Sequence, residues 1–190
     1  MKRLPRAVLA IHTFIAAALI ASSAVAADGW SELARPGAIV LFRHATAPGI
    51  GDPPGFKLDA CATQRNLDDS GRAEARKLGE MFRARKIQVT SVASSQWCRA
   101  RETARLAFGE QVRDEPAFNS FFRLSQEARE AQTEKARSLL ANWKGPGVLV
   151  VVTHQVNITA LTGIGAVSAE GVVVRRAADG TFQRVGTIAP

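Results

Sequence analysis

Two runs of apolar residues constrain the fold of this chain more than any other feature of its sequence. "GAIVLFRH" (residues 37–44) and "GVLVVVTH" (residues 147–154) each begin at a glycine and are rich in Val, Ile and Leu. Near-continuous apolar runs of this kind are typical of strands buried on both faces of a mainly parallel sheet. The sequence therefore predicts a three-layer α/β/α fold with helices on both faces of the sheet.

The remaining elements alternate along the chain in a pattern that agrees with this fold. We expect a weaker strand over residues 88–95 and two C-terminal strands joined by a turn at Asp179-Gly180. Helices are expected over residues 68–86, 94–108 and 124–143. The expected N-caps are Asp68 or Asp69 for the first helix and Ser94 or Ser95 for the second. The expected buried faces are Ala73, Leu78, Met81 and Phe82 in the first helix, and Leu124, Ala128, Ala131, Ala136, Leu139, Leu140 and Trp143 in the third.

The first 26 residues predict a cleaved signal peptide ahead of one α/β domain over residues 27–190. Lys2, Arg3 and Arg6 form a basic start, residues 7–21 are mostly apolar, and "AVA" supplies a cleavage site at residue 26. A retained membrane anchor is the alternative, although the apolar stretch is short for a span of about 20 residues. Cleavage predicts export, most simply to a bacterial periplasm, with no membrane anchor left.

The charge and the cysteines limit the class of partner and the compartment. Loss of the three basic leader residues lowers the formal charge from +8 to +5, which suits an anionic partner. Nucleic acid is not the expected partner, because no arginine-rich tract is interleaved with aromatic residues. Association with anionic lipid or polysaccharide stays open. In an oxidising compartment Cys61 and Cys98 predict a disulfide, with two free buried thiols as the alternative.

Each of the two main strands ends in a histidine, and these are the only histidines after the leader. In open α/β sheets ligands bind beyond the carboxyl ends of the strands, so His44 and His154 meet if their strands are neighbours. Two separate core histidines are the alternative interpretation. A metal site would need a third ligand such as Asp52, and the cation of Arg43 beside His44 disfavours it. No metal is therefore predicted.

Arginines near these histidines favour a phosphate ligand instead. Guanidinium groups match phosphate oxygens bidentately, and free N–H groups at a helix N-terminus add to the attraction. "SSQWCRARETA" places Arg99 and Arg101 in the first turns of a predicted helix. They are two residues apart and cannot share a helix face, so at most one is expected in the pocket. The Gly- and Pro-rich loop of residues 47–66 follows His44, at a position where function usually lies.

Four segments, taken in order over residues 37–163, resemble the histidine phosphatase (phosphoglycerate-mutase-like) superfamily. They are Arg43-His44, "NLDDSGRAEARKLGEMFRARKI", "SSQWCRARETA" and "VVTHQVNI". The resemblance implies that His44 is a nucleophile that becomes phosphorylated, while Arg43, Arg99 and His154 hold the phosphoryl oxygens. It also implies a two-step hydrolysis of phosphate monoesters with no metal or other cofactor.

The chain departs from the family pattern at two places. The family usually has glycine after Arg-His, and here Ala45 stands there, which would be unfavourable if the backbone needed a positive φ. The family also often supplies a glutamate as general acid. Here the acid candidates are Glu115 and Asp52, with Asp114, Asn119 and Ser120 nearby, and each could instead be a surface or turn residue.

The resemblance gives further residues an expected role. Arg65, Gln155 and Asn119 are candidates for contacts with substrate, and a Cys61–Cys98 bridge would pin the helix of the pocket arginine to the loop after the nucleophile. The sequence thus predicts an exported phosphatase whose substrate is a phosphorylated small molecule, an envelope saccharide or a phosphoprotein histidine. The alternative is a protein of the same fold that binds a phosphate ligand without turnover.

Overall fold

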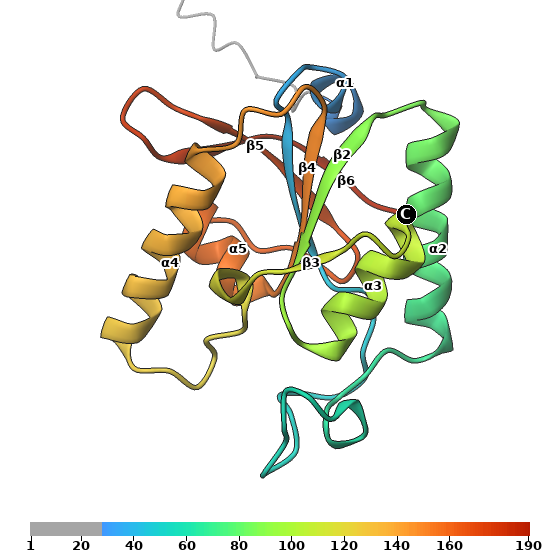
Figure 1. Cartoon of the computed structure of the whole chain (residues 1–190), viewed down its shortest axis with the longest axis vertical. Helices are drawn as coiled ribbons and strands as arrows, with labels where there is room; N and C mark the ends of the chain where they lie inside the picture. The colour runs from blue at the N-terminus through green and yellow to red at the C-terminus, as the bar shows by residue number, and fades with distance from the viewer. Residues whose placement is uncertain (1–27) are drawn as a thin grey trace, which may run out of the picture.

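A computed structural model describes residues 28–190, so the expected signal peptide lies outside the described part of the chain. A six-stranded sheet in the order β3-β2-β4-β1-β5-β6 lies between two layers of helices (Figure 1). The helices α4 and α5 cover one face, and α1, α2 and α3 cover the other (Figure 1). The three-layer α/β/α fold predicted from the sequence is confirmed.

The predicted strands and helices are all present, and their bounds differ from the expected ones by a few residues. The strands are β1 Ile39–Arg43, β2 Val89–Ser94, β3 Arg113–Asp114, β4 Val148–Thr153, β5 Gly171–Arg176 and β6 Phe182–Ile188. The α-helices are α1 Gly29–Leu33, α2 Asp69–Ala84, α3 Cys98–Phe108, α4 Gln126–Ala141 and α5 Gln155–Thr162; the short 3₁₀ helices are η1 Cys61–Thr63 and η2 Pro116–Phe118. The sequence did not predict α1, β3 or α5.

The sheet is parallel over four of its strands and antiparallel at one edge. Strands β1, β2, β3 and β4 are parallel, whereas β5 runs antiparallel to β1 and to β6. The turn between β5 and β6 contains Asp179-Gly180 as predicted, and Gly180 has a φ of 86°. All six residues of β4 are buried, which explains why this central strand is apolar in every residue except Thr153.

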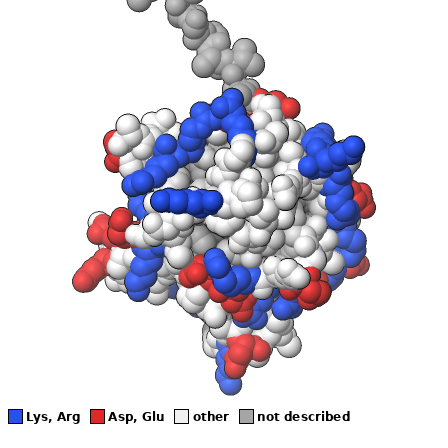
Figure 2. Space-filling view, turned by 45° about the horizontal axis from the view of Figure 1, so that its top comes forward, with Lys and Arg blue, Asp and Glu red and all other residues white. Residues whose placement is uncertain are grey.

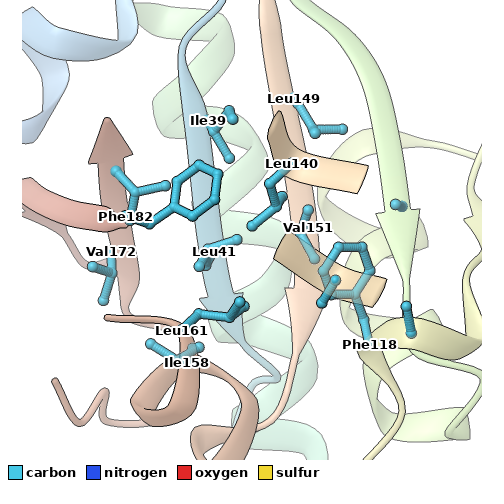
Figure 3. Packing of buried hydrophobic residues seen from close by; sticks show 14 of the residues in the cluster. Ile39, Leu41, Phe118, Leu140, Leu149, Val151, Ile158, Leu161, Val172 and Phe182 are labelled. Atoms are coloured by element: carbon cyan, nitrogen blue, oxygen red, sulfur yellow. The ribbon is translucent and has the colours of Figure 1, made fainter. Parts of the chain in front are cut away.

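The apolar residues of the central strands divide between two cores, one on each face of the sheet. Because successive side chains of a strand point to opposite faces, Leu41 packs with Leu140 and Ile158, while Phe42 packs with Leu78. Figure 3 shows the first of these cores, in which side chains from β1, β4 and β5 meet those of α4 and α5. The two cores fix the carboxyl ends of β1 and β4 from both sides.

Two of the predicted helix faces need correction. In α2 the buried residues include Ala75, Leu78 and Phe82, whereas Ala73 is exposed. Asp68 is the N-cap of α2 as expected, accepting a hydrogen bond from the Gly71 N–H at 2.7 Å. In α4 only Ala136 and Leu140 are buried, because the N-terminal half of this helix faces solvent. The residues wrongly expected in its buried face are Leu124, Ala131 and Leu139, all of which are exposed.

The surface carries charges of both signs. On the face shown in Figure 2, basic and acidic side chains alternate around a largely uncharged centre. The net positive charge of the chain is therefore not gathered into one continuous patch on this face. Within residues 28–190, every helix is too short or too polar to cross a membrane.

Candidate active site

The two histidines meet because their strands are neighbours. Strand β1 pairs with β4 in parallel, with Arg43 opposite Thr153, so the next residues on both strands are His44 and His154. The ring centroids are 5.4 Å apart, and the two residues are only 3% and 4% exposed. The His44 main-chain N–H donates to the Thr153 carbonyl at 3.0 Å. The carboxyl edge of the sheet therefore places both imidazoles in one crevice, as expected.

The hydrogen bonds of His44 determine which ring nitrogen can react. Its Nδ1 lies 2.8 Å from the Ala45 carbonyl oxygen, which can only accept, so Nδ1 carries the proton. Nε2 then carries the unprotonated lone pair, which accepts a hydrogen bond from Arg99 Nε at 3.2 Å. Burial, and next the charge of Arg99, lower the pKa of His44 to about 3, against the smaller opposing effect of the Ala45 bond. His44 is thus a neutral imidazole whose Nε2 carries the lone pair.

The segment after His44 is fixed against α2. The Thr46 main-chain N–H and hydroxyl donate to the Glu74 carboxylate at 2.9 and 2.8 Å. A Cβ atom at Gly71 would lie 2.0 Å from the Thr46 carbonyl oxygen, so only glycine allows α2 to approach this closely. Ala45 donates its N–H to Thr103 Oγ1 at 3.0 Å and does not have a positive φ. The alanine in place of the family's glycine is therefore accommodated without backbone strain.

Arg99 forms a nearly buried ion pair with Asp52. Its Nη1 and Nη2 donate to the two carboxylate oxygens at 2.7 and 3.2 Å, and the side chains are 3% and 8% exposed. Asp52 also accepts from the Arg65 N–H and from Trp97 Nε1, both at 3.0 Å. Burial raises the pKa of Asp52, but these hydrogen bonds and the charge of Arg99 outweigh it and lower the pKa overall. Asp52 is therefore an ionised partner of Arg99 and is not a proton donor at neutral pH.

The start of α3 differs from the sequence prediction. The helix begins at Cys98 with Trp97 as its N-cap residue, so neither Ser94 nor Ser95 caps it. Ser94 belongs to β2, and the Ser95 hydroxyl lies 2.8 Å from His154 Nε2. The buried side chain of Gln64 caps the helix instead, since its Oε1 accepts from the Cys98 N–H at 3.0 Å. The loop after His44 thus caps the helix that carries Arg99.

The predicted disulfide between Cys61 and Cys98 is present. The two cysteines are 37 residues apart in sequence, and among residues 28–190 no cysteine is free. Cys98 is the first residue of α3 and immediately precedes Arg99. The bridge therefore ties the loop of residues 47–66 to the helix turn that holds the pocket arginine, as the family resemblance implies.

Two further arginines contribute positive charge to the site. Arg43 Nη1 donates to the Ala166 carbonyl at 3.1 Å, and Arg65 donates to the carbonyls of Gly51 and Ala47. Burial, followed by the charge of Arg99, lowers the pKa of both guanidinium groups. Among residues 28–190, Asp52 is the only carboxylate that lines their cavity, so positive charge exceeds negative charge there. Such a cavity favours a bound anion.

The cavity has a volume of about 420 Å³ and opens between the loop of residues 47–66 and the segment after η2. It is lined by Arg43, His44, Gly49, Ile50, Gly51, Asp52, Phe56, Arg65, Trp97, Arg99, Ser120, Phe122, Arg123, Leu124, His154, Gln155 and Val156. A larger hollow of about 780 Å³ lies between α4 and α5 and shares part of this rim. The larger hollow contains neither histidine, so the smaller cavity is the candidate active site.

Comparisons with known proteins agree with this geometry. The family model of the histidine phosphatase superfamily (branch 1) matches residues 39–147. This chain belongs to the histidine phosphatase superfamily. The match spans β1 and α3, and therefore includes Arg43, His44 and Arg99, while His154 lies beyond it. No curated protein matches the chain significantly.

Solved structures share the histidine phosphatase fold at low sequence identity. The protein histidine phosphatase SixA, solved with tungstate, is 14% identical, with a TM-score of 0.56 over 80% of this chain and 97% of its own. A mycobacterial glucosyl-3-phosphoglycerate phosphatase, Rv2419c, solved with inorganic phosphate, is 17% identical, with a TM-score of 0.54 over 80% of this chain and 95% of its own. A candidate α-ribazole-5′-P phosphatase of Escherichia coli is 16% identical, with a TM-score of 0.57 over 80% and 94%. At these identities the likeness establishes the fold.

The two carboxyl candidates near η2, Asp114 and Glu115, lie outside the cavity of this superfamily member. Glu115 caps η2 by accepting from the Ala117 N–H, and Asp114 forms a bidentate pair with Arg101 at 2.6 and 2.8 Å. Arg101 therefore points away from the pocket, which confirms that only one of the two α3 arginines enters it. Of the acid candidates, only Asp52 and Ser120 line the cavity.

The three substrate-binding candidates likewise divide into those that line the cavity and those that do not. Arg65 and Gln155 line the cavity, whereas Asn119 does not. Asn119 Oδ1 accepts from the Gln96 N–H at 2.8 Å and from the Ser95 hydroxyl at 3.3 Å. It therefore positions Ser95, which in turn contacts His154.

Sequence reasoning missed several residues of the site. Ser95 follows the carboxyl end of β2, so the rule that located the histidines would also have found it. Trp97, Phe56, Phe122 and Arg123 reach the cavity from irregular segments, and no periodic pattern marks them. Across residues 28–190, no three His, Cys, Asp or Glu side chains are grouped so as to hold a metal ion.

Proposed function

We propose that this chain is a phosphatase that hydrolyses phosphate monoesters through a phosphohistidine on His44. One observation carries the proposal. His44 lines an anion-attracting cavity, its unprotonated Nε2 accepts from Arg99 Nε at 3.2 Å, and a pKa lowered to about 3 keeps the ring neutral at neutral pH. A binding pocket would use the arginines but has no need of a nucleophile at this position.

In the first step His44 Nε2 attacks phosphorus and forms a P–N bond. The P–O bond to the alcohol breaks, and its electron pair leaves with the alcohol oxygen. Arg43 and Arg99 stabilise the charge that spreads over the phosphoryl oxygens, and His154 lies beside the same group. When the Arg99 guanidinium leaves Asp52, its Nη1 and Nη2 turn to donate to the phosphoryl oxygens.

In the second step a water molecule attacks the phosphohistidine. The P–N bond breaks, its electron pair returns to Nε2, and inorganic phosphate is released.

Among the described residues that line the cavity, Asp52 is the only carboxyl group, and it is ionised. The leaving oxygen therefore takes its proton from water, which favours alcohols of low basicity.

The comparisons support phosphorylated substrates of more than one kind. The similar folds include one named for protein histidine phosphatase activity and one named for glucosyl-3-phosphoglycerate. Phosphate monoesters of sugars and of envelope saccharides are candidate substrates, and phosphoprotein histidines, in which the bond to be broken is P–N and not P–O, are a further candidate class. All three are met in the periplasm after cleavage of the signal peptide. The second candidate is a phosphate-binding protein without turnover, favoured because the described residues that line the cavity include no protonated carboxyl group to serve as a general acid.

The test is hydrolysis of 4-nitrophenyl phosphate by residues 27–190, with and without EDTA, beside His44→Ala. We expect EDTA-resistant turnover that falls about ten-thousandfold or more in the variant, because nucleophile removal has effects of this size. Phosphate should still raise the Tm of both proteins if both are folded. Stabilisation by phosphate with no turnover by the unmodified sequence would establish the binding protein instead.

A further inference from the structure

Large apolar side chains gather at the mouth of the candidate active site. In the described part of the chain five large hydrophobic residues are exposed, and three of them line this one cavity. These three are Ile50, Phe122 and Leu124, which are 96%, 60% and 41% exposed. Single exposed hydrophobics are ordinary, but a cluster around a cavity marks a surface that contacts a ligand.

The apolar side chains come from three separate segments around the opening. Ile50 and Phe56 belong to the loop of residues 47–66, Phe122 and Leu124 to the segment before α4, and Val156 to α5. We call these five residues the apolar rim. One member of the rim, Phe56, packs against Trp97, with ring centroids 5.7 Å apart. The cavity is thus lined by arginines around the neutral His44 and by apolar side chains at its mouth.

The rim is held in place by polar contacts that leave its apolar surface free. Arg123 Nη2 donates to the Asp52 carbonyl at 2.9 Å and so joins the segment before α4 to the loop of residues 47–66. Trp97 Nε1 donates to the Asp52 carboxylate, and the disulfide at Cys61 anchors the same loop. The two sides of the mouth are therefore connected around an open cavity.

We propose that the rim selects substrates whose leaving group is apolar, an aryl or alkyl phosphate in preference to a sugar phosphate. This inference rests on the proposed function, because it assigns the part of the substrate that points away from His44. A sugar at the mouth would lose water from its hydroxyl groups against apolar side chains, with Ser120 and Gln155 as the neutral polar side chains in reach. An aryl group would instead bury apolar surface against Phe122 and Ile50.

The test compares two aryl phosphates with the same reacting atom and nearly equal leaving-group basicity. 4-tert-Butylphenyl phosphate presents an apolar para substituent, and 4-(β-glucopyranosyloxy)phenyl phosphate presents a polyhydroxylated one. We expect kcat/KM to be about tenfold or more higher for the tert-butyl substrate, since small apolar groups in a fitted pocket have effects of this size. Equal values, or preference for the glucosyl compound, would overturn the inference.

Two double variants test whether the substrate preference comes from the rim or from exposed hydrophobic residues in general. Ile50→Ser with Phe122→Ser should reduce the preference to about threefold or less. The matched control, Leu139→Ser with Val167→Ser, removes exposed hydrophobics outside the cavity and should keep the full preference. If the rim variant kept the preference, the rim would not be its cause. Absence of hydrolysis of both compounds by folded protein would instead refute the proposed function.

Discussion

The cavity has two walls that are built in different ways. One wall is formed by the ends of β1 and β4 and the first turn of α3, where His44, His154 and Arg99 are at most 4% exposed. The other is the loop of residues 47–66, which contains one short 3₁₀ helix and carries the almost fully exposed Ile50. Reacting groups need fixed positions, which strand ends supply. The loop supplies Asp52, whose negative charge balances that of Arg99, and the apolar side chains of Ile50 and Phe56.

Few contacts hold the loop of residues 47–66 in place, and the Cys61–Cys98 disulfide is expected to contribute most to the free energy of unfolding. Replacing Cys61 and Cys98 together by Ser should lower the free energy of unfolding by about 4 kcal/mol on the chain-entropy model for this loop length. KM should rise more than kcat falls, since the loop carries Arg65 and the partner of Arg99. Urea unfolding and steady-state kinetics measure the two effects.

Reduction provides the control for this change. Dithiothreitol should destabilise the unmodified sequence by a similar amount and leave the double Ser variant unchanged. A loss of less than 1 kcal/mol in the variant would show that the polar contacts of Asp52 and Gln64 hold the loop without the bridge.

The strand wall was predictable from the sequence, and the loop wall was not. Near-continuous burial of β1 and β4 leaves an apolar pattern that locates His44 and His154 without knowledge of other contacts. The pairing of Asp52 with Arg99 joins residues 47 positions apart and depends on how the loop packs. Polar contacts of this kind have no periodic pattern in the sequence, so Asp52 was identified only as an acid or ligand candidate.

The start of α3 and the whole of α5 were predicted wrongly for different reasons. Ser95 was expected to cap α3, but its hydroxyl contacts His154 and Gln64 takes over the cap. Helix α5 was missed because its residues are almost uniformly apolar or β-branched and show no amphipathic period. At α3 a tertiary contact at the active site outweighs the local preference, whereas the sequence of α5 carries no periodic signal.

The two arginines of α3 provide the next test of the strand wall. Arg99→Ala should lower kcat/KM for an aryl phosphate about a hundredfold or more, because it removes the guanidinium that in the proposed mechanism stabilises the transition-state charge. Arg101→Ala is the matched control, since its side chain pairs with Asp114 outside the cavity, and it should change kcat/KM less than threefold. Similar losses in the two variants would contradict the assignment of Arg99 to the pocket.

The buried histidines predict a pH dependence of stability. Burial, followed for His154 by the charge of His44, lowers the pKa of both imidazoles below the usual 6.5. The unfolded chain therefore binds more protons than the folded chain once the pH falls through 6.5. The free energy of unfolding of residues 27–190 should fall by about 2 kcal/mol between pH 7 and pH 5.5.

Urea titrations at these two pH values measure this change, and His44→Gln should remove about half of it. The lowered pKa of Asp52 acts in a separate window, because its contribution is lost only as the pH falls below the usual aspartate value of 3.8. A stability that stayed constant from pH 7 to pH 5.5 would mean that the histidines are not neutral and buried together.

The smallest expected effect concerns the alanine that replaces the family's glycine beside the nucleophile. Ala45 is fully buried, its N–H and C=O contact Thr103 and His44, and its φ is not positive. Ala45→Gly should therefore destabilise the protein by about 1 kcal/mol, through a freer unfolded chain and a lost methyl contact. Turnover should change less than twofold, because both contacts belong to the main chain. A tenfold gain in kcat would instead show that the Ala45 methyl group obstructs His44.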